Sequence, residues 1–179
     1  TSGVLNLAPA DGTNGGVVTT AAQTFAGAKT FSADLTVNGL TVGRGNTGDN
    51  TNSALGVSAL LTNTAGTDNT AVGNKALKLT NGNGTTGSYN AAFGSLSMEN
   101  NTTGARNAAF GPQALRMNTT GNYNSGLGYS ALYGVTTASD NTAMGNLAGY
   151  NITTGAKNIF IGSNAGSSIS TGTTANSTG

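Results

Sequence analysis

The fold is decided by residues 107–140, where NAAFGPQALRMNTTGNY (107–123) is followed directly by NSGLGYSALYGVTTASD (124–140). Related 17-residue phrases start at seven asparagines. Every step between starts is 17 residues, except one of 21 where four residues are inserted near Gly82–Thr85. The starts are Asn52, Asn69, Asn90, Asn107, Asn124, Asn141 and Asn158. A fixed short period predicts stacked coils rather than one globular core.

Each repeat follows the consensus N-x-A-φ-G-x-x-A-L-x-x-N-T-T-G-x-x, in which φ is a large apolar residue and the first Asn is position 1. Two apolar pairs recur, represented by Ala109-Phe110 and Ala114-Leu115. Each pair lies in a short run between Gly or Asn residues, too short for a helix of the usual length of about 11 residues. The pattern therefore predicts two short strands in each coil.

Side chains of neighbouring residues in a strand point to opposite faces. If each alanine points into its coil, the large residue after it points outward and leaves an apolar stripe that needs a cover. We therefore expect a homo-oligomer, a homotrimer, whose bulky rows meet at a common axis. The candidate interface residues are Leu55, Val72, Phe93, Phe110, Leu127, Met144 and Ile161.

The regions around the repeats have different compositions. Residues 1–23 predict a loosely ordered lead-in, and residues 24–50 predict a β-stalk or hairpin with a junction. In the stalk, Phe31, Leu35 and Val37 alternate with polar residues before the turn signal Asn38-Gly39. Residues 51–172 hold the repeats, and residues 173–179 predict a frayed tail or linker.

Together these patterns predict an all-β fold, a parallel β-roll or β-solenoid of about seven 17-residue coils. Each coil would lie about 4.8 Å above the last. Glycines recur where such a path must bend, as at Gly111 and Gly121.

Composition argues against several classes of function. The 179 residues include 29 glycines, no His and no Cys, so the usual general base, metal ligands and thiol nucleophile are missing, and we expect neither an enzyme nor a cofactor. A net charge of +1 from scattered residues argues against nucleic acid. No apolar run reaches the roughly 20 residues that span a bilayer, so we expect no membrane insertion. One enzymatic alternative is a carboxylate site between subunits, built from Asp68, Glu99 or Asp140.

Three polar columns have alternative readings. The repeated asparagines are expected to form a structural ladder rather than to bind glycan hydroxyls. The Thr pairs, such as Thr119-Thr120, are explained by strand propensity or by an ice-binding surface, and an ice-binding β-solenoid is the alternative function. The last repeat position predicts an exposed column, either merely solvated or facing a receptor: Asp68, Tyr89, Arg106, Tyr123, Asp140 and Lys157.

The phrase N-x-A-φ-G-x-x-A resembles the repeats of trimeric autotransporter adhesin heads. NTAVGNKAL (69–77) and the segment AAQTFAGAKTFSADLTVNGLTVG (21–43) are similar to phage tail-fibre proteins. The resemblance covers roughly residues 20–172 and implies a trimeric parallel β-roll. It also implies a structural or receptor-binding fibre segment on a virion or cell surface, which attaches to a host through a surface glycan or a protein receptor.

Overall fold

The computed structural model describes residues 35–37, 39–45, 51–80, 87–169 and 176–178. All of them belong to one compact unit, Ala33–Gly179. The lead-in predicted at residues 1–23 lies outside the described residues. The described residues form strands and turns and no helix, which confirms the all-β prediction. The strands are β1 (Leu35–Val37), β2 (Leu40–Gly43), β3 (Ser53–Gly56), β4 (Thr70–Val72), β5 (Ala91–Phe93), β6 (Ala108–Phe110), β7 (Ser125–Leu127), β8 (Thr142–Met144), β9 (Ile159–Ile161) and β10 (Asn176–Thr178).

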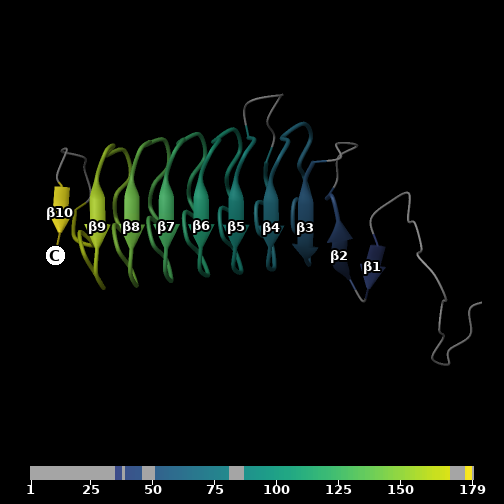
Figure 1. Ribbon diagram of the computed structural model, residues 1–179, viewed down its shortest axis with the longest axis horizontal. Helices are drawn as coiled ribbons and strands as arrows, with labels where there is room; N and C mark the ends of the chain where they lie inside the picture. The colour runs from purple at the N-terminus through teal and green to yellow at the C-terminus, as the bar shows by residue number, and fades with distance from the viewer. Residues whose placement is uncertain (1–34, 38, 46–50, 81–86, 170–175, 179) are drawn as a thin grey trace, which may run out of the picture. The chain divides into compact units, whose positions relative to one another are not determined.

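Strands β3 to β9 form one parallel sheet in sequence order (Figure 1). Each residue pairs with the equivalent residue of the next coil, as Phe93 does with Phe110. The register also holds across the insertion, where Ala71 pairs with Ala92, so the extra residues leave the ladder unchanged. This in-register stack confirms the β-solenoid with its 17-residue period.

The predicted hairpin forms at the N-terminal end of this sheet. Strands β1 and β2 are antiparallel with Val37 opposite Leu40, which leaves a two-residue connection, and Gly39 in it has a φ of 80°. Positive φ in such a turn explains the Asn-Gly signal. β2 then pairs antiparallel with β3, placing Val42 opposite Leu55. The predicted start of the alternation, at Phe31, lies outside the described residues.

At the C-terminal end, a short strand lies within residues 173–179, for which the sequence predicts a frayed tail or linker. Strand β10 pairs parallel to β9 with Asn176 opposite Ile159, which continues the 17-residue spacing. The consensus is lost in this region, but ladder hydrogen bonds come from the backbone and do not depend on consensus side chains.

The first apolar pair of each repeat behaves as the alternation predicts. In β5 the side chain of Ala92 is fully buried in the coil, whereas Phe93 lies on the outer face and is only half-buried. The same arrangement holds for Ala109 and Phe110 in β6. At this position small residues therefore lie beneath the sheet in every coil but the last, where Phe160 is buried instead.

The second pair corrects the prediction of two strands per coil. Ala114 and Leu115 are both fully buried, and they lie in turns rather than in a strand. Leu115 has a φ of 52°, and Gln113 before the pair has a φ of 61°. Strict alternation requires an extended backbone, so these left-handed residues allow both side chains to point inward. The turns still stack, because the N–H of Leu115 donates to the carbonyl of Ala131 at 3.0 Å.

A glycine column follows the strands and brings successive backbones into close contact. Gly111 has a φ of 140°, and a Cβ on it would lie 2.5 Å from the carbonyl oxygen of Gly128. An alanine would be strained there and would also collide with the next coil. The bend after each strand therefore requires glycine.

Candidate functional site

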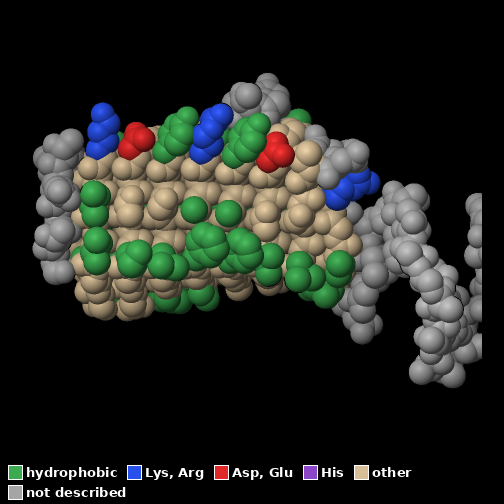
Figure 2. Space-filling view, viewed as in Figure 1, with side chains coloured by type: hydrophobic (Ala, Val, Ile, Leu, Met, Phe, Trp, Pro, Cys, Tyr) green, Lys and Arg blue, Asp and Glu red, His purple; other side chains and the backbone are tan. Residues whose placement is uncertain are grey.

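The bulky residues of β3 to β9 form what we call the outer apolar row: Leu55, Val72, Phe93, Phe110, Leu127, Met144 and Ile161. Their exposed fractions run from 41% for Phe110 to 49% for Met144, apart from Val72 and Phe93, which are half-buried. Figure 2 shows hydrophobic side chains gathered along the face that carries the strands. The structure thus places the predicted interface residues together on one surface of the single chain.

Two aromatic rings of this row are stacked on one another. The rings of Phe93 and Phe110 are parallel, with 4.9 Å between centroids and 7° between planes. This distance matches the strand spacing of about 4.8 Å, so the ladder itself sets the ring geometry. The row is therefore a regular surface with one apolar side chain per coil.

The repeated asparagines are buried and form the predicted ladder. Oδ1 of Asn107 accepts the backbone N–H of Asn124 at 2.8 Å, and its Nδ2 donates to the carbonyl of Gly121 at 2.8 Å. Nδ2 also contacts Oδ1 of Asn90 at 3.2 Å. Equivalent bonds recur along the column, so these amides hold the bends rather than face a ligand.

A second buried asparagine column lies at position 12, where the consensus carries Asn but no structural role was predicted for it. Nδ2 of Asn118 donates to Oδ1 of Asn101 at 2.7 Å. The next coil carries Val135 at this position, and Oδ1 of Asn118 is buried with no hydrogen-bond partner among the described residues. The column could have been found from the repeat alignment, because Asn63, Asn101 and Asn118 share one position.

The last repeat position forms what we call the edge row: Asp68, Tyr89, Arg106, Tyr123, Asp140 and Lys157, all exposed. A row of charged and hydrophobic side chains is visible along one edge in Figure 2. The guanidinium of Arg106 lies 5.2 Å from the ring centroid of Tyr89 and 5.6 Å from that of Tyr123. Three predicted receptor-facing residues are therefore brought into one cation–π stack.

The edge row is also held firmly. The backbone N–H of Arg106 donates to the carbonyl of Ser88 at 3.0 Å, and that of Tyr123 donates to Ala105 at 3.2 Å. Asp140 and Lys157 continue the row in the following coils, with φ values of 61° and 60°. The row therefore presents its side chains from a backbone that is tied to the coils beneath it.

The acidic residues considered for a carboxylate site are not brought together within this chain. Asp68 and Asp140 are four coils apart in the edge row, about 19 Å at the usual strand spacing. Glu99 lies in a different column and pairs with Arg116 at 2.9 Å. Within the described residues, no group of three or more Asp, Glu, His or Cys side chains is placed to hold a metal ion.

The Thr pairs lie in the bends, outside the strands. The hydroxyl of Thr102 donates to the carbonyl of Thr119 at 2.9 Å, and that of Thr119 donates to Thr136 at 3.0 Å. The hydroxyl groups of this column therefore donate hydrogen bonds that join neighbouring coils. Nothing in the described residues favours the ice-binding alternative over a fibre.

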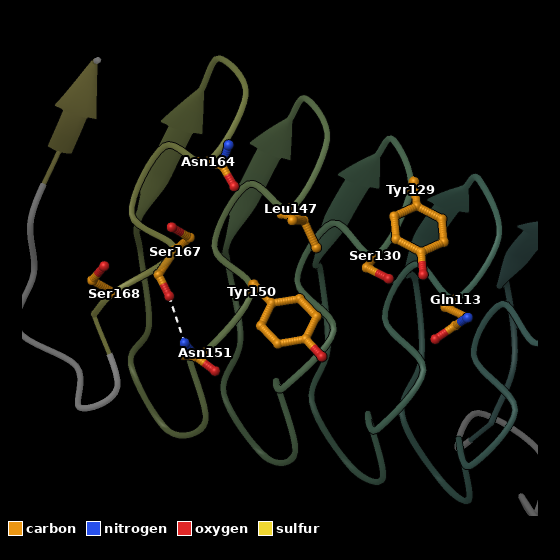
Figure 3. A pocket seen from close by; sticks show the side chains of 9 residues that line it. All are labelled: Gln113, Tyr129, Ser130, Leu147, Tyr150, Asn151, Asn164, Ser167 and Ser168. Carbon is orange, nitrogen blue, oxygen red and sulfur yellow. Dashed lines mark hydrogen bonds between the residues drawn. The ribbon is translucent and has the colours of Figure 1, made fainter.

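A shallow groove of about 530 Å³ lies over the turns that follow β6 to β9, and the repeat pattern gave no indication of it. We call it the tyrosine groove; its lining includes Gln113, Tyr129, Ser130, Leu147, Tyr150 and Asn151. The rings of Tyr129 and Tyr150 project from neighbouring coils with Ser130 between them in Figure 3. The sequence shows only that tyrosine replaces the Asn or Ser found at position 6 in several other coils, which does not place Tyr129 next to Tyr150.

The described part of the chain holds no helix that could cross a lipid bilayer. Comparisons with models of protein families, with curated proteins and with solved structures found no match to this chain.

Proposed function

We propose that the chain is a structural and receptor-binding segment of a phage tail fibre or bacterial surface adhesin. It assembles with copies of itself and attaches its carrier to a host surface. The observation that supports this most directly is the outer apolar row, which runs unbroken over seven successive strands. Continuous exposed apolar surface of this kind typically marks a protein interface.

The geometry of the row favours a second copy of the chain as its partner. Its side chains repeat at about 4.8 Å per coil over about 29 Å. A partner must offer apolar groups at the same spacing, and another copy of the same row does so without any adjustment. In an assembly with closed symmetry, each copy of the row packs against the rows of the other copies, so every row is covered. We infer three copies around one axis.

Rigidity supports the fibre role. Buried Asn amides, the glycine column and backbone bonds tie every described coil to the next. A stiff rod can hold a binding surface at a distance from its carrier, as a fibre must. The edge row, with its stacked Tyr89, Arg106 and Tyr123, is the candidate surface for a cell-surface glycan or protein receptor. The location that follows is a virion tail fibre or the outside of a cell.

Sedimentation of the purified chain tests this proposal. Wild-type protein is expected to sediment as a trimer at micromolar concentration. The double variant Phe93→Ser and Phe110→Ser removes the stacked ring pair from the row, and it is expected to shift the population toward monomer. Both residues are partly exposed, so the coil beneath them keeps its buried core.

The matched control is the double variant Tyr89→Ser and Tyr123→Ser, which removes two exposed rings from the edge row. It is expected to remain trimeric, and circular dichroism should show the same β signal for all three proteins. A wild-type chain that sediments as a compact monomer over this concentration range contradicts the proposal.

A further inference from the structure

We propose that the tyrosine groove binds an uncharged saccharide. This inference rests on the proposed attachment function, since it names the class of surface molecule that the segment would recognise. It adds a second recognition surface, over the turns that follow β6 to β9, to the edge row proposed above.

The two rings supply the apolar part of such a site. Tyr129 has 49% of its surface exposed. Tyr150 is half-buried, with its ring stacked on Tyr133 at 4.9 Å between centroids and 11° between planes. A ring held by a neighbour offers its surface at little entropic expense. The C–H faces of pyranose rings pack against aromatic surfaces of this kind.

The remaining lining supplies hydrogen-bonding groups without charge. Gln113, Asn151 and Asn164 carry amides, and Ser130 carries a hydroxyl. Amides and hydroxyls both donate and accept, which matches sugar hydroxyls that do the same. None of the nine lining residues is Asp, Glu, Lys or Arg. Nothing in the lining therefore pairs with a sialic acid, sulfate or phosphate group.

The groove wall is set by the backbone before any ligand arrives. The N–H of Ser130 donates to the carbonyl of Pro112 at 3.0 Å, and that of Leu147 donates to Tyr129 at 2.9 Å. On the opposite side, Nδ2 of Asn151 donates to the carbonyl of Ser167 at 2.6 Å, as drawn in Figure 3. A preformed groove of about 530 Å³ is within the size range of small-ligand sites.

The test uses the whole 179-residue chain and saturation-transfer NMR. Probes are neutral trisaccharides of glucose, galactose, mannose or N-acetylglucosamine, with sialyllactose as the acidic comparison. At least one neutral trisaccharide is expected to bind at millimolar concentration or below. Tyr129→Ser is expected to weaken its Kd by roughly tenfold or more. Serine already occupies the equivalent position at Ser95 and Ser163, so this variant should fold.

Leu61→Ser is the matched control, because Leu61 has a similar exposed fraction of 46% but lies outside the groove, the edge row and the outer apolar row. It is expected to leave neutral-sugar binding unchanged. The inference is overturned if no neutral sugar binds, if only sialyllactose binds, or if Tyr129→Ser binds as well as wild type.

Sedimentation separates this inference from the proposed function. A trimer that binds no neutral sugar leaves the fibre proposal standing and removes the groove as a site. A monomer whose sugar binding depends on Tyr129 keeps the groove as a site and removes the fibre proposal.

Discussion

The ring of Phe160 occupies interior space directly against the backbone of Gly149. A Cβ on Gly149 would lie 2.8 Å from Cδ2 of Phe160, and Phe160 is fully buried. Most earlier coils place alanine where Phe160 lies and leucine where Gly149 lies, as in Ala109 and Leu115. In the last coils this interior volume is therefore filled by a side chain from a strand, Phe160 of β9, rather than by a leucine from the turns.

This exchange predicts strong coupling between the two positions. Phe160→Ala alone should lower the free energy of unfolding by about 3 to 5 kcal/mol because it leaves a cavity. Gly149→Leu alone should also destabilise, by overpacking. The double variant should be less destabilised than the sum by at least about 1 kcal/mol. Guanidinium unfolding at one fixed protein concentration gives all four values, and strict additivity would contradict the packing exchange.

The asparagine ladder predicts a large loss on removing one rung. Asn107→Ala deprives the buried N–H of Asn124 of its acceptor, so we expect a loss of about 3 kcal/mol in the free energy of unfolding. Asn146→Ala, at an exposed asparagine, should change the value by less than about 0.5 kcal/mol. Chemical denaturation compares the two, and equal effects would show that the ladder does not stabilise the coils.

The glycine column predicts a steric effect beyond backbone preference. Gly111→Ala combines positive φ with the clash against Gly128, and we expect a loss of about 3 kcal/mol or more. Gly39→Ala also has positive φ but would meet no atom within 4 Å, so only about 1 kcal/mol should be lost. Thermal melts of both variants test this difference, and equal losses would contradict a steric contribution from the neighbouring coil.

The unpartnered Oδ1 of Asn118 predicts a contrast between two polar substitutions. Val135→Asn brings an amide donor next to this oxygen, whereas Ile152→Asn finds no asparagine in the coil before it. Val135→Asn should therefore be less destabilising by about 1 to 3 kcal/mol. Denaturation midpoints compare them, and an equal loss would mean that the oxygen is already satisfied.

The parts of the fold that could be predicted rest on period and on local chemistry. The 17-residue spacing sets the parallel register, Asn38-Gly39 marks the hairpin, and repeated asparagines ladder because equivalent residues lie one above another. The outward direction of Phe110 followed from alternation within an extended strand. Each of these depends only on neighbours in sequence or on the repeat itself.

The rest depends on backbone conformation that alternation does not describe. Leu115 points inward because its φ is positive. A signal existed, since none of the described non-glycine residues with positive φ is Val, Ile or Thr, the types that such conformations exclude most strongly. The tyrosine groove was beyond prediction, because Gln113, Tyr129 and Tyr150 come from different coils and meet only through the shape of the turns.

Cross-linking at a chosen row tests self-association through the strands most directly. The chain has no cysteine, so Leu127→Cys in the outer apolar row or Tyr123→Cys in the edge row introduces a single thiol. A short bis-maleimide should rapidly join Leu127→Cys chains into covalent dimers, because residues beside a common axis meet their own copies. It should leave Tyr123→Cys chains unlinked. Rapid linkage at position 123 with none at position 127 would contradict the account.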